Sequence, residues 1–299
     1  MATLALPSTG RAQGVAFVLV AGLLWSTIPL GVRFMESATA AQIVFWRAAV
    51  QVPVLIAILL VRYRGRVVKP VRSIGWNGVW GAFALAIAYV SGMAALTLTT
   101  VGNAVFVLST APLMTALLAR LLLKERLKRT TWIAMGLASL GVAVMTVAAV
   151  GSGQLAGNVA AAVSAFGYAV FTVSLRRGRT GDMLPTIALS GVLAAIMAAF
   201  IADGLTVSSG DLAIAAYLGA FGIGLGLVLY TAGSKTLSAA ELPLVAMIEV
   251  VLAPIWVWLF LGEAIDAATF LGGAIVLAAV LIQALLGFRR ERLPIGMGT

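Results

Sequence analysis

Ten runs of about 20 apolar residues follow one another along the 299-residue chain. As a helix, each run is long enough to cross the roughly 30 Å hydrocarbon core of a bilayer. Only 10% of the residues are charged and 62% are apolar, which leaves too little polar surface for a water-soluble domain of this size. We therefore predict an all-α integral membrane protein with ten transmembrane helices. The runs are Gly14–Val32, Ala40–Val61, Ile74–Leu96, Val101–Leu123, Thr131–Val150, Leu155–Leu175, Met183–Ala202, Leu212–Gly233, Leu242–Leu261 and Ala267–Phe288.

The basic residues predict the orientation of these helices. All but two of the 20 Lys and Arg residues precede the first run or lie at or beyond the end of an even-numbered run, so they share one side of the membrane. Such clusters face the cytoplasm in membrane proteins, and we predict that both termini are cytoplasmic. The positive net charge therefore indicates orientation, with no nucleic-acid partner. The clusters are Arg11; Arg62, Arg64, Arg66, Lys69 and Arg72; Arg120, Lys124, Arg126, Lys128 and Arg129; Arg176, Arg177 and Arg179; Lys235; and Arg289, Arg290 and Arg292.

A weak internal repeat divides the chain into two halves. Residues Gly81-Ala82-Phe83 recur as Gly219-Ala220-Phe221, and Leu123-Lys124-Glu125 recurs as Leu261-Gly262-Glu263 with the same offset. Each half holds five runs, an odd number, so the second half must be inverted relative to the first. Inverted repeats with a binding site between them are a transporter architecture. We predict repeats over residues 14–150 and 151–288, with cytoplasmic tails over 1–13 and 289–299.

Several of these motifs resemble the drug/metabolite transporter superfamily of the EamA type. The resemblance rests on Gly-x-Phe early in the third helix of each repeat, on the Glu125 and Glu263 motifs, and on Trp25-Ser26 and Arg47. Ten-helix members are similar to bacterial exporters of amino acids, including aromatic ones. The resemblance implies a central cavity among the third, fourth, eighth and ninth helices, and a location in the bacterial inner membrane. No oligomer is indicated, so a monomer is our expectation.

Glu249 is the strongest candidate for substrate binding, because an acid in mid-membrane is expensive and is usually functional. It could bind a substrate ammonium group. Tyr89 and Tyr230 could line the path, although buried tyrosines also serve as packing, and Trp25 is expected to pack in the core. Arg47 could bind a carboxylate, but the implied layout favours a structural role with its stem toward lipid. The predicted substrate-binding residues are Glu249, Tyr89, Tyr230, Ser109, Thr110, Trp80 and Asn103, and the predicted hinges are Pro112, Pro254, Gly222 and Gly226.

Absent residue types exclude several kinds of chemistry. The chain has neither Cys nor His, so disulfides, thiol chemistry and the commonest metal ligand are excluded, and we expect no catalytic residue, metal or cofactor. It also has no ATP-binding Gly-x-x-x-x-Gly-Lys-Ser/Thr loop. An integral-membrane enzyme and a channel or structural scaffold both fit poorly.

We therefore expect a secondary transporter that exports small amphipathic metabolites by alternating access. Amino acids with aromatic or apolar side chains are the favoured substrates. A multidrug or lipophilic-cation exporter is the alternative. A nucleotide-sugar or sugar-phosphate carrier is less favoured, because only Arg47 lies within a span to bind phosphate.

Overall fold

The computed structural model describes residues 10–98, 104, 107–125, 128–146, 155–262 and 267–289. Every element in these ranges is a helix. Because lipid offers no hydrogen-bond partners to the backbone, helices are the expected solution for runs this apolar. The helices are α1 Arg11–Ser26, α2 Ile28–Arg33, α3 Ala40–Arg62, α4 Val68–Ser73, α5 Gly75–Leu98, α7 Ala111–Leu122, α8 Arg129–Thr146, α9 Leu155–Arg177, α10 Leu184–Ile201, α11 Ser209–Tyr217, the π-helical η1 Leu218–Leu225, α12 Gly226–Gly233, α13 Glu241–Ala246, α14 Ile248–Leu261 and α15 Ala267–Arg289.

Seven helical segments among the described residues are long and apolar enough to cross a membrane. Three further apolar helices are shorter, at Ala111–Leu122, Arg129–Val144 and Phe270–Ile282. These findings confirm the predicted class, an all-helical multi-pass membrane protein. The count of ten spans stays a prediction. The seven segments are Arg11–Arg33, Ala40–Arg62, Gly75–Leu98, Leu155–Arg177, Leu184–Ile201, Ser209–Gly233 and Glu241–Leu261.

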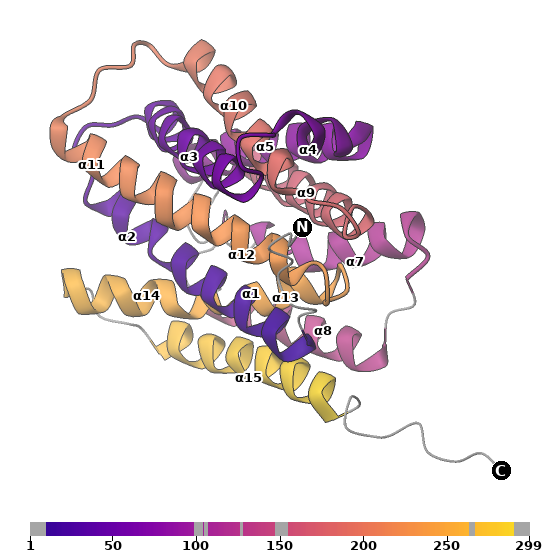
Figure 1. The fold of residues 1–299 in the computed structure, drawn as a ribbon. Helices are drawn as coiled ribbons and strands as arrows, with labels where there is room; N and C mark the ends of the chain where they lie inside the picture. The colour runs from indigo at the N-terminus through magenta and orange to yellow at the C-terminus, as the bar shows by residue number, and fades with distance from the viewer. Residues whose placement is uncertain are drawn as a thin grey trace.

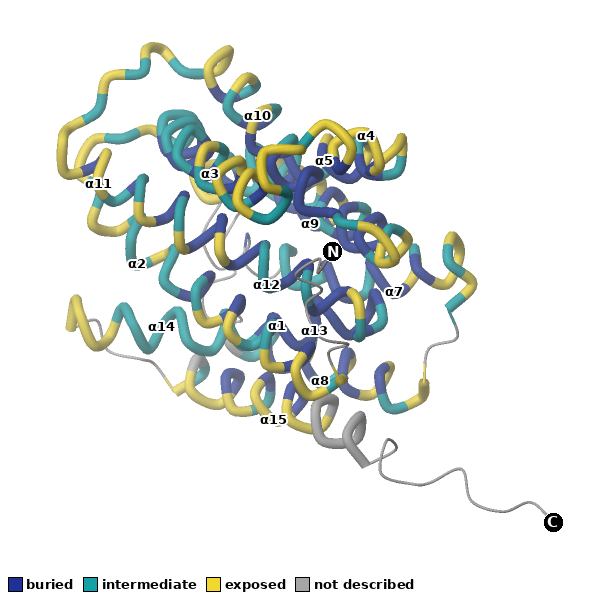
Figure 2. The backbone as a smooth tube through the Cα atoms, viewed as in Figure 1, coloured by how far each residue is buried: buried dark blue, intermediate teal, exposed yellow. Residues whose placement is uncertain are grey.

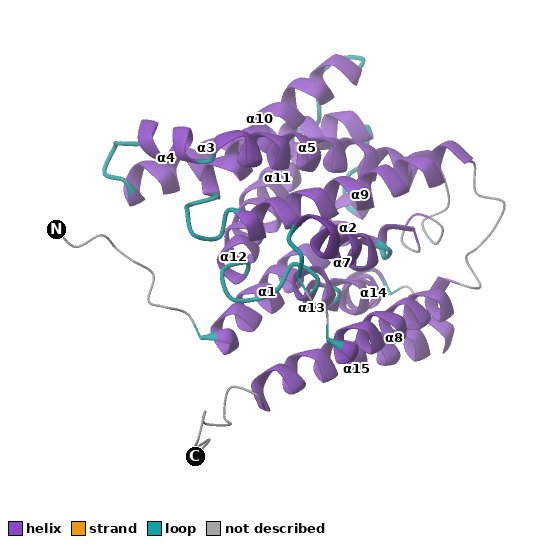
Figure 3. Cartoon of the chain, turned by 90° about the vertical axis from the view of Figure 1, so that its right-hand side faces the viewer, coloured by secondary structure: helices purple, strands orange, loops and turns teal. Residues whose placement is uncertain are grey.

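Helices from the two halves of the chain pack against each other rather than forming separate bodies. In Figures 1 and 3, α8 lies beside α15, and α5 lies beside α9. Helix α3 packs on α10, and α1 packs on α12. The largest apolar core accordingly combines Trp25 and Leu85 from the first half with Phe171 and Tyr230 from the second. Neither half has a complete core without the other.

The outer surface of this bundle is apolar. Figure 2 shows that burial changes along each helix, with exposed residues on the outer side. Trp76, Phe200 and Phe270 are each at least 75% exposed. In water such a surface would be costly, but lipid tails solvate it without penalty.

Candidate functional site

Three of the apolar segments are interrupted within the bundle. Helices α1 and α2 are separated at Thr27, and α13 and α14 are separated at Met247. The chain also turns at Ser109 and Thr110, immediately before α7. Broken helices are tolerated inside a membrane where protein or a polar cavity surrounds them, and transporters place substrates beside such breaks. The Met247 break comes two residues before Glu249.

The eighth predicted span contains the π-helical segment η1. Such segments are rare and occur often at functional sites. Gly219 lets η1 touch α3, because a Cβ there would lie 2.2 Å from the Arg47 carbonyl oxygen. A Cβ at Gly226 would lie 2.4 Å from Trp25 Nε1, whereas one at Gly222 would meet nothing closer than Ile28 at 3.5 Å. Gly226 therefore permits close packing, and Gly222 has room for a side chain.

An aromatic group lies where α1, α9 and α12 meet. The Trp25 ring centroid is 6.2 Å from that of Tyr168 and 5.2 Å from that of Tyr230. Tyr168 and Tyr230 are 5.7 Å apart. The Tyr230 hydroxyl lies 3.0 Å from Thr172 Oγ1, whose proton is donated to the Tyr168 carbonyl, so Tyr230 is the donor to Thr172. These rings form one wall of the candidate site.

Arg47 on α3 points into the bundle instead of toward lipid. It is only 5% exposed, and its guanidinium carbon lies 4.9 Å from the centre of the Tyr89 ring. The Tyr89 hydroxyl lies beside Gln51 and Ser190, and Tyr89 is also close enough to Tyr168 for the two groups to interact electrostatically. Arg47 forms neither an ion pair nor a hydrogen bond with any residue that the structure describes. The expectation that its stem lies in lipid is therefore corrected.

Glu249 lies in the first turn of α14. Its carboxylate interacts electrostatically with Tyr168 and Tyr230. It is half-buried, and within the described ranges it accepts no hydrogen bond and forms no ion pair. The described structure thus has a base over Tyr89 and an acid that interacts with Tyr168 and Tyr230, and it does not pair the acid with the base.

We call Trp25, Arg47, Tyr89, Tyr168, Tyr230 and Glu249 the central cluster. Five buried polar atoms in or beside it have no hydrogen-bond partner among the described residues. An arginine in mid-membrane costs about 2.5–3.5 kcal/mol on insertion scales. A cation–π contact with one tyrosine contributes about 0.5–2 kcal/mol. Tyr89 alone therefore does not offset the cost of burying the Arg47 charge. The five atoms are Trp25 Nε1, Arg47 Nε, Gln51 Oε1, Tyr89 Oη and Tyr168 Oη.

Only some of the residues predicted to bind substrate meet in this cluster. Glu249, Tyr89 and Tyr230 belong to it. Trp80 does not, since its side chain is 62% exposed and packs edge-on to Phe83. Asn103 lies outside the described residues.

The remaining predicted residues lie in or next to α7 and α14. Ser109 and Thr110 are half-buried at the start of α7, where the Thr110 hydroxyl donates to the Val107 carbonyl over 2.6 Å. Helix α7 packs against α9 and α13. Of the predicted hinges, Pro112 is buried in the first turn of α7, and Pro254 lies inside α14.

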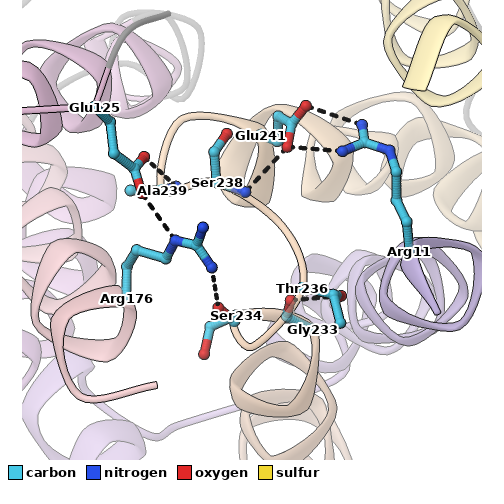
Figure 4. Close-up of polar contacts among 9 residues, drawn as sticks. All are labelled: Arg11, Glu125, Arg176, Gly233, Ser234, Thr236, Ser238, Ala239 and Glu241. Carbon is cyan, nitrogen blue, oxygen red and sulfur yellow. Dashed lines mark hydrogen bonds and ion pairs between the residues drawn. The ribbon is translucent and has the colours of Figure 1, made fainter. Parts of the chain in front are cut away.

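Two ion pairs tie several helix ends together on the side of Arg11 (Figure 4). Arg11 donates to both oxygens of Glu241 at 2.9 and 3.1 Å, and Arg176 Nε donates to Glu125 over 2.9 Å. The loop between α12 and α13 joins both pairs. Its Ser238 and Ala239 amides donate to the two glutamates, and its Ser234 carbonyl accepts from Arg176. We call Arg11, Glu125, Arg176, Ser234, Ser238, Ala239 and Glu241 the Arg11–Arg176 network.

Separate polar contacts hold α3 at its two ends. Beyond its last turn, the Tyr63 hydroxyl donates to Asp182 over 2.5 Å, and Arg62 lies 3.4 Å from the same carboxylate. Burial raises the pKa of Tyr63 to about 12, and the bond to Asp182 adds to this shift. The phenol is therefore protonated at neutral pH and remains the donor. Near the first turn of α3, the Gln42 amide donates to the Gly204 and Thr206 carbonyls.

The fold and the site define a multi-pass membrane protein with an unpaired polar centre between its halves. Residues 12–147 and 155–285 each match the EamA-like transporter family. These matches cover most of the chain, which therefore belongs to that family. It is a membrane transporter of the drug/metabolite type and not an enzyme.

Comparisons with individual proteins add support for the fold alone. No curated protein matches the chain. One crystal structure matches over 94% of this chain and 100% of its own, with a TM-score of 0.79 and 23% sequence identity. At 23% identity this similarity is evidence of a shared fold, and it carries no information about the substrate.

Sequence reasoning missed one member of the central cluster, Tyr168, and misjudged the direction of another, Arg47. Arg47 carried a usable signal, since it is the only base away from the ends of a predicted span, yet its direction was not deducible. Tyr168 is a mid-span tyrosine like Tyr89 and Tyr230 and could have been found in the same way. Trp25 does pack in the core as expected, but its indole nitrogen has no partner among the described residues.

Proposed function

We propose that this protein is a secondary transporter that exports small amphipathic metabolites, with aromatic or apolar amino acids as the substrate class. The observation that carries the proposal is that Glu249 has no ion-pair or hydrogen-bond partner within the described ranges and interacts electrostatically with Tyr168 and Tyr230. The carboxylate suits a substrate ammonium group, and the aromatic faces suit an apolar side chain. No cofactor or ATP site is required, so transport would follow concentration or ion gradients.

The membrane arrangement is part of this proposal. We infer that residues 14–150 and 151–288 form two five-helix repeats of opposite orientation, with tails 1–13 and 289–299 in the bacterial cytoplasm. Packing between helices supports the repeats. Exchanging each helix for its counterpart in the other half converts the α5–α9 contact into α1–α12, and α7–α9 into α1–α14. The same exchange leaves α3–α10 and α8–α15 unchanged.

Alternating access would involve the Arg11–Arg176 network. Its two ion pairs connect α1 to α13, and α9 to the segment after α7. By the charge rule this network faces the cytoplasm. Loading from the cytoplasm would therefore require these pairs to separate, while the breaks at Thr27 and Met247 provide places where helices can bend.

A lipophilic-cation exporter is the second candidate, because Glu249 beside tyrosine rings would also bind an organic cation. The buried charge of Arg47 weighs against it, since a substrate without an anion would leave that base unpaired. A carrier of sugar phosphates would need further bases in the cluster, and Arg47 is the one buried base among the described residues.

Counterflow in proteoliposomes tests the proposal. Labelled aromatic amino acids, organic cations and sugar phosphates would be compared for wild type, Glu249→Gln and Asp203→Asn. Asp203 is an exposed acid in the loop after α10 and serves as the matched control. A charged hydrogen bond contributes about 1.5–3 kcal/mol, so Glu249→Gln should lower amino acid counterflow by about tenfold or more. Wild-type counterflow by Glu249→Gln would make that carboxylate structural.

A further inference from the structure

Arg47 is a buried base without a charged partner among the described residues. It is 5% exposed and has no ion pair or hydrogen bond within the described part of the chain. The half-buried arginines Arg11 and Arg176 differ from Arg47, because each has a glutamate at 2.9 Å. Buried charges in proteins are normally paired. Within the described ranges, the one interaction of the Arg47 guanidinium is with the face of the Tyr89 ring.

The position of Arg47 is held firmly by the backbone. Gly219 brings η1 against the Arg47 peptide so closely that a Cβ would lie 2.2 Å from its carbonyl oxygen. One turn later on α3, Gln51 is fully buried and donates to the Ile187 carbonyl of α10. Arg47 therefore projects from a helix that is packed on both neighbours, and a rigid support favours a defined binding geometry.

The neighbours of Arg47 supply a second donor of the right kind. The Tyr89 hydroxyl is buried and without a partner among the described residues, and the ring carrying it lies under the guanidinium. A guanidinium fork matches the two oxygens of a carboxylate. A phenol can add a third hydrogen bond to the same group.

We propose that Arg47 binds the carboxylate of the substrate and that Tyr89 donates a hydrogen bond to it. This inference rests on the proposed function and names its substrate class, a zwitterion with a single carboxylate. Glu249 binds the ammonium group, and the Trp25, Tyr168 and Tyr230 rings hold the apolar part. One buried base and one unpaired acid together balance a ligand of zero net charge. Arg47 thereby separates amino acids from lipophilic cations.

The test compares phenylalanine with one analogue that lacks the carboxylate and one that lacks the ammonium group. Phenylalanine, phenylalanine amide and 3-phenylpropanoate would compete for labelled phenylalanine counterflow by wild type, Arg47→Gln, Arg47→Lys and Arg66→Gln. Arg66 is exposed in the loop before α4 and is the matched control. Size-exclusion profile and melting temperature would establish that each variant is folded.

We expect wild type to prefer phenylalanine over its amide by about tenfold or more, the ratio that one charged hydrogen bond provides. Arg47→Gln should abolish this preference by weakening phenylalanine alone, with the amide unchanged. Arg47→Lys should restore part of it, since the charge returns without the fork. Arg66→Gln should behave as wild type.

The outcomes separate this inference from the proposed function. If wild type transports phenylalanine, and phenylalanine and its amide compete equally well for that transport, the proposed role of Arg47 is overturned without any variant being needed. An Arg47→Gln protein that keeps the tenfold preference would also overturn it. Wild type that transports organic cations and no amino acid would instead overturn the proposed function, and this inference with it. If Arg47→Gln fails to fold, the preference for phenylalanine over its amide, measured for wild type and for Arg47→Lys, still tests the role of Arg47.

Discussion

The hydroxyl groups of the central tyrosines differ in what they contact, although the rings lie together. Tyr230 donates to Thr172 over 3.0 Å, whereas the hydroxyls of Tyr89 and Tyr168 are buried with no partner among the described residues. A buried hydroxyl without a partner costs about 1–3 kcal/mol. Such a cost is retained where the group has a ligand to bind. Removing either hydroxyl should therefore leave stability unchanged or raise it, and should weaken substrate binding.

We predict that Tyr89→Phe and Tyr168→Phe leave the melting temperature unchanged or raise it, because each removes an unsatisfied hydroxyl. Both should weaken substrate competition several-fold, the effect of about 0.5–1.5 kcal/mol per neutral hydrogen bond. Tyr230→Phe is the control: it loses the bond to Thr172 and should lower the melting temperature. Thermal unfolding in detergent and counterflow competition check the two effects. Equal destabilisation by all three variants would contradict the assignment.

At the scale of helices, the ends on the Arg11 side depend on a few charged contacts. Side chains in the Arg11–Glu241 pair are 11% and 6% exposed, so removing one partner leaves a poorly solvated charge. Leaving such a charge unpaired costs about 3–5 kcal/mol. The apolar contacts between α1 and α13 remain. Loss of the pair should therefore favour a state in which these ends separate, without unfolding the bundle.

We predict that Glu241→Gln speeds labelling of a cysteine placed at Ala246, which is 2% exposed on α13. The chain has no native cysteine, so the label is unambiguous. A thiol reagent added to open membranes should react at least about tenfold faster than in the protein with intact Glu241. The exchanged pair Arg11→Glu with Glu241→Arg should recover most of the protection. Arg179→Gln, an exposed base after α9, should have no effect.

At the scale of the whole molecule, the two ends of α3 should lie on opposite sides of the membrane. The loop after α3 is basic, and the loop between α10 and α11, which contacts the start of α3, is not. We predict that an impermeant thiol reagent added to intact cells labels Thr206→Cys and not Arg66→Cys. Both positions are exposed. Labelling of Arg66→Cys in intact cells would contradict cytoplasmic termini, and breaking the cells should expose both sites equally.

The sequence by itself determined the class of molecule. Runs of 20 apolar residues have one stable form in lipid, because every backbone group must find its partner within the segment. The helical multi-pass fold and the EamA family followed from those runs and from short motifs around Gly81, Glu125 and their recurrences. Mid-span polarity also indicated Glu249, Tyr89 and Tyr230, since a polar group among apolar ones is conspicuous in one dimension.

Only the tertiary structure decided which side chains meet. A helix places its residues around a full circle, so the sequence did not tell whether Arg47 or Trp80 faces lipid or protein. Packing of α3 against η1 turned Arg47 inward, while Trp80 came to lie outside. The ion pairs Arg11–Glu241 and Arg176–Glu125 join residues far apart in the chain. Such pairings depend on how helices are arranged in three dimensions, because charge and spacing along a single helix carry no information about its neighbours.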